Sequence, residues 1–158
     1  MTLIPLIAAL MFAQGTQTSV ETRTANLQFT VDDISGKHVA LDSYKGEVIL
    51  LDFWATWCAP CRKQIPEFMD LYKRYKSRGV VVLGVSVDES PAAVKKFVKE
   101  LRVNYPILLS GTRDDLQQAF GPPGFPTLYI IDRDGQIRSQ HTGLTSMEEV
   151  ERTINLLL

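Results

Sequence analysis

The 158-residue sequence is poor in cysteine and histidine and has almost no excess of charge. Its two cysteines, Cys58 and Cys61, exclude a scaffold held by several disulfides and a zinc site made of four cysteines. Its 17 basic and 18 acidic residues give a formal net charge of −1, so the chain offers no basic surface for nucleic acid. Apolar residues make up 45% of the chain, as in a globular domain with a core.

The start of the chain also lacks charge, since the first charged side chain is Glu21. Residues 3–13 are apolar apart from Pro5, and as a helix they would span about 16 Å of a bilayer core about 30 Å thick. Ala13 and Gly15 then supply the small residues of a signal-peptide cleavage site, although no Lys or Arg follows Met1. An alternative is a buried element of the folded domain.

From this segment we predict a signal peptide or short anchor over residues 1–15, a polar linker over 16–28 and one domain over 29–158. The protein is then periplasmic or secreted, with or without a membrane tether. If the segment is not a signal, the protein is cytoplasmic.

Hydrophobic patterning predicts an α/β domain. Val48–Trp54 and Val80–Val87 are nearly continuous apolar runs, typical of central strands covered on both faces. Helically spaced apolar residues follow in Cys58–Arg78, and Ser90-Pro91 opens a second helix. Further elements are expected as strands at 29–31, 38–41, 106–109, 127–131 and 136–142, and as helices at 112–120 and after a Ser146/Glu149 capping box. The order predicts a mixed sheet between helices.

The cysteine pair lies where a buried strand ends and a helix begins. A helix N-terminus carries partial positive charge and unpaired N–H groups, so a thiolate at Cys58 is stabilised there, and Cys61 lies one turn further on. Zinc would need more ligands than His38 and His141 provide at their spacing, and a c-type haem needs a histidine where Arg62 stands. A purely structural disulfide would close too small a loop to stabilise the fold much. We therefore predict a reversible dithiol–disulfide couple, with no metal and no organic cofactor.

Residues Leu51–Glu67 (LDFWATWCAPCRKQIPE) resemble the active-site segment of the thioredoxin superfamily. The match is to exported thiol–disulfide oxidoreductases, the group that includes the reductants of cytochrome c maturation. Pro66 matches the proline inside the family's active-site helix, Gly124–Thr127 its cis-proline loop, and Gly143 the bulge before its last helix. The resemblance implies a thioredoxin fold: a central mixed sheet flanked by helices, with an N-terminal β-hairpin and an inserted strand–helix element.

Two acidic residues are candidates for proton transfer. Asp52 lies within an apolar strand, where burial of an unpaired carboxylate is costly and raises its pKa. It matches the buried acid that the family places behind the second cysteine, whereas the lysine that partners this acid is missing and its place falls near Gly84. A solvated position at a strand edge is the alternative. Glu89 resembles an acid near the cysteines in the cytochrome c branch, or else it only favours the dipole of the next helix.

Five residues are candidates for binding a target protein. Trp57 flanks the nucleophile and Pro60 lies between the cysteines. By resemblance, the loop that contains Phe125, Pro126 and Thr127 presents its backbone to an extended target peptide.

The resemblance implies thiol–disulfide exchange, with Cys58 as nucleophile. The Ala59-Pro60 dipeptide favours a reductant over an oxidase or isomerase. Expected partners are disulfide-containing proteins and a membrane thiol electron donor, and we expect a monomer. A thiol peroxidase is one alternative, but Trp54 and Thr56 do not fit the usual Pro-x-x-x-Thr-x-x-Cys pattern. A non-catalytic chaperone or assembly subunit is another.

Overall fold

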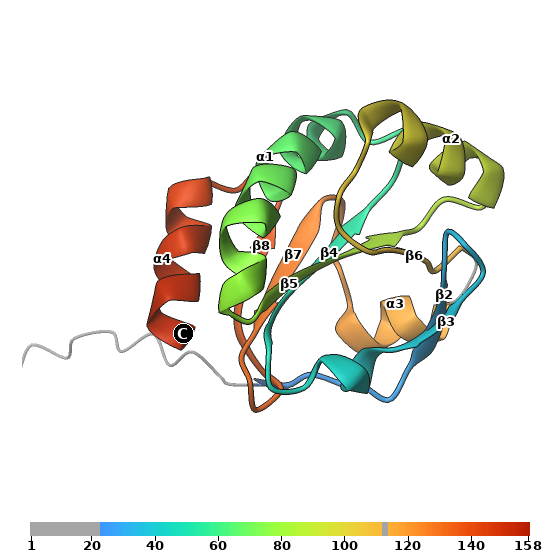
Figure 1. Cartoon of the computed structure of the whole chain (residues 1–158). Helices are drawn as coiled ribbons and strands as arrows, with labels where there is room; N and C mark the ends of the chain where they lie inside the picture. Colours follow the sequence, from blue (N-terminus) through green and yellow to red (C-terminus); the bar gives the residue numbers. More distant parts are fainter. Residues whose placement is uncertain (1–22, 112–113) are drawn as a thin grey trace, which may run out of the picture.

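The computed structural model describes residues 23–111 and 114–158 (Figure 1). A single eight-stranded sheet runs in the order β1-β8-β7-β4-β5-β6-β2-β3. Its strands are β1 (Arg23–Thr24), β2 (Thr30–Asp33), β3 (His38–Ala40), β4 (Val48–Trp54), β5 (Val80–Ser86), β6 (Ile107–Leu109), β7 (Thr127–Ile131) and β8 (Gln136–Thr142). The α-helices are α1 (Ala59–Tyr75), α2 (Pro91–Leu101), α3 (Asp114–Phe120) and α4 (Met147–Leu157), with short 3-10 turns at Leu41–Tyr44 and Lys76–Arg78.

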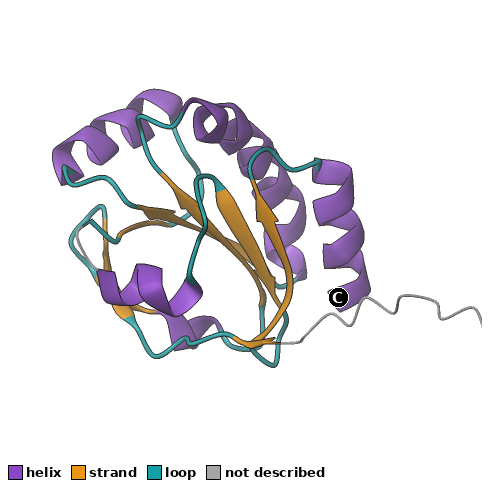
Figure 2. Cartoon of the chain, turned by 180° about the vertical axis from the view of Figure 1, so that it is seen from behind, coloured by secondary structure: helices purple, strands orange, loops and turns teal. Residues whose placement is uncertain are grey.

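The sheet is mixed and its centre is fully buried. β4 pairs in parallel with β5 and antiparallel with β7, and every residue of β4 and β5 is buried. Helices α1, α2 and α4 pack on one face, where they share a core with Leu50 and Trp54 of β4. α3 and the 3-10 turn after β3 pack on the other face (Figures 1 and 2). The predicted α/β class and mixed sheet are confirmed.

The two flanking additions are also present. β2 and β3 form the N-terminal antiparallel hairpin, and the hairpin joins the sheet beside β6. β6 and α3 form the inserted strand–helix element that precedes the proline-rich loop. Ser146 is the N-cap residue of α4 as predicted, but its side chain makes no capping hydrogen bond. The capping box is therefore wrong in its hydrogen bonding although right in its position.

The predicted start of the domain is too late. Arg23–Thr24 pairs with β8, and the Ala25 amide donates to the Gly135 carbonyl oxygen at 2.9 Å. Ala25 and Leu27 insert into the core on the α3 face, because they are the apolar residues in an otherwise polar stretch. Residues 23–28 thus belong to the domain and not to a linker. The predicted signal segment, 1–15, and the first part of the predicted linker lie outside the described residues.

Helix α4 is fixed to α1 by a bidentate ion pair. The Arg74 guanidinium donates to both carboxylate oxygens of Glu151 at 2.6 and 2.7 Å, and the Tyr75 hydroxyl donates to one of them at 3.0 Å. The hydrogen bonds from Arg74 hold the pKa of Glu151 below its usual value. Within residues 23–111 and 114–158, no helix is long and apolar enough to cross a membrane.

Candidate active site

The two cysteines form a disulfide at the start of α1, with their Cα atoms 5.3 Å apart. Cys58 is the N-cap residue of the helix, and its sulfur accepts a hydrogen bond from the Cys61 amide at 3.3 Å. This donor and the positive end of the helix stabilise a thiolate at Cys58 once the disulfide is reduced. Cys58 is 5% exposed and Cys61 only 1%, so Cys58 is the less buried of the two cysteines.

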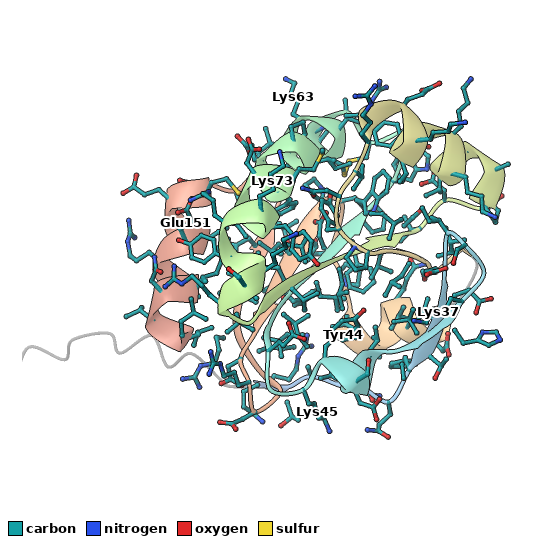
Figure 3. All side chains as sticks on the ribbon, in the orientation of Figure 1. Lys37, Tyr44, Lys45, Lys63, Lys73 and Glu151 are labelled. Carbon is teal, nitrogen blue, oxygen red and sulfur yellow. A yellow bond between two sulfur atoms is a disulfide. The ribbon has the colours of Figure 1, made fainter. Side chains whose placement is uncertain are left out.

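Two basic residues lie near the start of α1. Arg62 and Lys63 are exposed, and Lys63 points away from the domain (Figure 3). Pro60 is half-buried between the cysteines, where a helix tolerates proline because its first N–H groups have no intrahelical partner. Pro66 lies inside α1, as the resemblance implied.

The loop before β7 has the expected cis-proline. The Phe125–Pro126 peptide bond is cis, and the Pro126 carbonyl oxygen accepts a hydrogen bond from the Gly143 amide at 2.8 Å. Thr127 is buried, and its hydroxyl donates to the Gly124 carbonyl oxygen at 2.7 Å, so its side chain braces the loop from within. Gly143 has a φ of +84°, which favours glycine at this contact.

Two aromatic side chains form the exposed rim of this site. Trp57 is 67% exposed, the highest exposure of a large apolar side chain near the cysteines. Its ring lies edge-to-face with the half-buried ring of Phe125, with the centroids 6.0 Å apart. The structure therefore brings together the residue before Cys58 and the residue before the cis-proline.

Asp52 is buried beneath the helix that carries the cysteines. It is two residues from both Leu50 and Trp54 on β4, and these two share a core with Cys61, so the Asp52 side chain emerges on the same face of the sheet. It is 1% exposed, and its Oδ1 atom has no hydrogen-bond partner in the described part of the chain. Burial raises the pKa of Asp52 to about 8. The solvated alternative is excluded.

Gly84 occupies the position next to Asp52 where the family's partner lysine was expected to be missing. Gly84 is the residue of β5 that pairs with Asp52 in the parallel ladder. No basic side chain therefore comes from that position.

A second buried acid, Asp88, was missed by sequence reasoning, which chose Glu89. Asp88 follows β5 and is 6% exposed, whereas Glu89 is exposed. The Asp88 carboxylate accepts hydrogen bonds from the Thr56 amide at 2.9 Å, from the Thr56 hydroxyl, and from the Ser86 hydroxyl at 2.8 Å. Asp88 thus holds Thr56, in the segment between β4 and Cys58, by hydrogen bonds.

The register of the central strands explains how Asp88 meets Thr56. Trp54 and Ser86 pair at the carboxyl ends of parallel strands β4 and β5, so the residues that follow them meet at one edge of the sheet. Thr56 and Asp88 are two residues beyond that pair on each side. Glu89 turns outward at the approach to α2 because Asp88 already fills the inward position.

Gln64 is another buried polar residue that sequence reasoning missed. It lies one turn after Cys61 on α1, is 1% exposed, and donates from Nε2 to the Thr145 carbonyl oxygen at 3.4 Å. This contact joins α1 to the loop that also supports the cis-proline. A polar residue three positions after the inward-facing Cys61 was the available signal. Over residues 23–111 and 114–158, no group of three or more His, Cys, Asp or Glu side chains could hold a metal ion.

Comparison with known proteins identifies the family. The model of the AhpC/TSA family matches residues 23–140. The chain belongs to the AhpC/TSA family. Relatives of this AhpC/TSA chain include the thiol-disulfide oxidoreductase ResA of Geobacillus kaustophilus, 32% identical over 155 residues that cover 95% of this chain and 88% of the relative. ResA of Bacillus subtilis is 36% identical over 129 residues, 82% of this chain and 72% of the relative.

Solved structures agree with this placement of the AhpC/TSA domain. A thiol:disulfide interchange protein DsbE from Chlorobium tepidum matches with a TM-score of 0.77 at 27% identity, over 85% of this chain and 97% of the other. The exposed lipoprotein thioredoxin Etrx1 of Streptococcus pneumoniae matches with a TM-score of 0.73 at 28% identity, over 82% and 98%. The predicted thioredoxin fold is confirmed. The protein is a thiol–disulfide oxidoreductase with disulfide-containing proteins as its substrate class.

Proposed function

We propose that this oxidoreductase reduces disulfides of exported proteins through Cys58 and Cys61. The Cys58 thiolate attacks one sulfur of the target disulfide, a mixed disulfide forms, and the other target sulfur leaves as a thiolate. Cys61 then attacks the Cys58 sulfur, so that the Cys58–Cys61 disulfide forms and the reduced target leaves. Two electrons pass to the target. The observation that carries this order is Cys58 at the N-cap of α1, with the Cys61 amide donating to its sulfur.

Asp52 is the proposed proton acceptor for the second step. The thiol of Cys61 must lose a proton before it attacks, and a free thiol has a pKa of about 8.5. Burial raises the pKa of Asp52 to about 8, so its carboxylate is a stronger base than that of an exposed aspartate and is suited to accept this proton. Glu89 is the weaker candidate for this role because it is exposed.

A target segment binds across the rim of the site. Trp57 and Phe125, whose rings contact each other, offer an apolar surface next to Cys58 in the sequence and at the cis-proline, and the half-buried Pro60 lies between the cysteines. The backbone beside Pro126 pairs with an extended peptide, while Thr127 keeps the loop in shape from inside.

The direction and location of the reaction rest on the sequence. Ala59-Pro60 between the cysteines supports a reductant, and the charge-free apolar segment at residues 3–13 supports export to the periplasm or beyond, with or without a tether. A reductant outside the cytoplasm needs a supply of electrons, which a membrane thiol transporter provides. The resemblance makes cytochrome c maturation the first process to examine for its targets.

The test is to trap the mixed disulfide. In cells that make the Cys61→Ser variant, the Cys58 thiolate still attacks but its adduct is not resolved, so disulfide-linked target proteins accumulate on non-reducing gels. The matched Cys58→Ser variant gives none. Equal adducts from both variants would contradict the assignment of Cys58 as nucleophile. Adducts confined to cytoplasmic proteins would contradict export.

Direction is tested by equilibration of the Cys58–Cys61 couple with glutathione. A potential near −270 mV, about that of thioredoxin, supports a reductant, and one near −120 mV, about that of a strong oxidant, overturns it. Peroxide consumption faster than insulin-disulfide reduction would favour a peroxidase instead. Full complementation by a double Cys→Ser variant would favour a non-catalytic scaffold.

A further inference from the structure

Three buried polar atoms lie without partners in the layer beneath α1. They are Asp52 Oδ1, the Trp54 indole Nε1 and the Tyr105 hydroxyl, and none has a hydrogen-bond partner in the described part of the chain. Trp54 is fully buried, and Asp52 and Tyr105 are 1% and 5% exposed. Native proteins leave few buried polar groups unpaired, because each loses its hydrogen bonds to water. Three such groups in one otherwise apolar core suggest that they interact with one another during the reaction.

The three side chains meet over Gly84. Gly84 pairs with Asp52 across β4 and β5, and neighbouring strands lie about 4.8 Å apart, so the Asp52 side chain emerges beside the space above Gly84. A Cβ atom at Gly84 would lie 3.1 Å from Trp54 Nε1 and 3.1 Å from Tyr105 Cε2. The same atom would be 2.7 Å from Ile107 Cδ1, closer than side chains pack. Glycine is therefore what lets the tyrosine and indole rings approach the backbone of β5 beside Asp52.

Electrostatics supports the same neighbourhood. Burial, and next the charge of Asp52, raise the pKa of Tyr105 well above its usual value. The tyrosine hydroxyl therefore keeps its proton at every working pH and can act as a hydrogen-bond donor to a carboxylate.

Few other ionisable groups face this layer. α1 contributes Cys58, Cys61 and Tyr72, whose ring lies 6.4 Å from that of Tyr105. β5 contributes glycine at this level and β7 contributes Leu128, which pairs with Asp52. α2 contributes Phe97, which packs on Trp54 at 5.4 Å and carries the exposed Arg62 guanidinium of α1 over its ring.

We propose that Tyr105 is a positioning residue for Asp52. Its hydroxyl donates a hydrogen bond to the Asp52 carboxylate when that acid is ionised, directly or across one enclosed water, and the Trp54 N–H is a second donor to the same carboxylate. The proposal rests on the proposed function of Asp52 as the acceptor of the Cys61 proton. A donor that meets only the ionised acid keeps part of Asp52 ionised near neutral pH, ready to take that proton. The Cys61 thiolate formed in this way attacks the Cys58 sulfur, and the proton stays on Asp52.

The first measurement is the titration of the Asp52 carboxyl carbon by NMR in the oxidised protein. Tyr105→Phe removes one hydroxyl and keeps the ring, so loss of the donor should raise the Asp52 pKa by roughly 0.5 to 1 unit, a 3- to 10-fold change in proton affinity. Tyr72→Phe, a tyrosine in contact with the same ring, should leave the titration unchanged. An unchanged Asp52 titration in a folded Tyr105→Phe protein overturns the proposal. Trp54→Phe gives a second, smaller shift in the same direction.

The second measurement follows release of a target from a mixed disulfide preformed on Cys58. In Tyr105→Phe, release at pH 7 should slow roughly 3- to 10-fold and recover at high pH, where Asp52 is ionised in both proteins. Tyr105→Phe should add nothing to that pH profile in an Asp52→Asn background. If Asp52→Asn itself leaves the profile unchanged, the proposed proton transfer is wrong, whereas the NMR titration still decides whether Tyr105 supports Asp52.

Discussion

Asp52 and Asp88 are two buried carboxylates near one disulfide, and their surroundings differ in every other respect. Asp52 lies mid-strand in β4 with Oδ1 unpartnered in the described residues, and burial raises its pKa to about 8. Asp88 lies just after β5 and accepts from Thr56 twice and from Ser86 once. Burial alone therefore does not tell what an acid does. The unpartnered acid is suited to take up a proton, and the partnered acid to fix a loop.

The backbone explains why the two acids differ. In the middle of β4 the amides are engaged in ladders with β5 and β7 on both sides, so none is left to serve a side chain. Beyond the ends of the strands the Thr56 amide has no ladder partner and is free to donate to Asp88. An acid inside a strand is thus left without backbone donors, whereas an acid at a strand end receives them.

The largest effect is expected from Asp52→Asn, as an increase in stability. The unfolded acid loses its proton near pH 4 and the native one near pH 8, so between these values the native state holds more protons and the free energy of unfolding falls as pH rises. The shift corresponds to about 1.4 kcal/mol for each pKa unit, and burial of the new amide offsets part of it. The difference between variant and wild type should therefore move by about 5 kcal/mol over this range, from a loss of about 2 kcal/mol near pH 4 to a gain of about 3 kcal/mol at pH 8.

Urea unfolding of the oxidised protein at a series of pH values measures this gain. The wild-type curve should slope downward from pH 4 to 8 and the variant curve should be flatter. Parallel curves would mean that Asp52 titrates as an ordinary surface acid, and the contrast with Asp88 would be lost.

A loss of stability, somewhat smaller in size, is expected from Asp88→Ala. The change leaves the Thr56 amide, the Thr56 hydroxyl and the Ser86 hydroxyl without their acceptor, which should lower the free energy of unfolding by about 2 to 4 kcal/mol. Asp88→Asn keeps one acceptor oxygen and should cost less.

Thr56 supplies the matched control for Asp88. Thr56→Ser keeps the hydroxyl donor and should stay close to wild type, whereas Thr56→Val removes it and should cost about 1 kcal/mol. In an Asp88→Ala background the valine change should cost less, since its partner is already gone. Additive losses would show that the two residues do not act as one unit.

Much of the fold could be predicted because local patterns were strong. Thr127–Ile131 and Gln136–Thr142 are strands with the predicted bounds, and Ser90-Pro91 begins α2 as expected. The start of the domain could not be predicted, because Ala25 and Leu27 are isolated apolar residues whose burial depends on strand pairing far along the chain. Thr24 pairs with Gln136 across a separation of 112 residues, and a pairing at that distance leaves no local signal in the sequence.

The residues of the site also fall into those that the sequence could place and those that it could not. Cys58, Cys61 and Pro126 stand in a short motif or a short loop, so their sequence neighbours were enough to place them. The role of Asp88 depends on β4 and β5 ending side by side, which only the three-dimensional register supplies. Adjacent acids such as Asp88 and Glu89 cannot be ranked from the sequence, because a turn decides which one faces inward.

The smallest effect is expected from Glu89→Gln, the acid favoured by the sequence. Its side chain is exposed, so loss of its charge should change the free energy of unfolding by less than about 0.5 kcal/mol. The pH profile of target release should also stay that of the wild type, in contrast with Asp52→Asn. A shift of that profile by Glu89→Gln as large as the one at Asp52 would show that proton transfer at this site uses an exposed acid. The difference between partnered and unpartnered buried carboxylates would then concern stability alone.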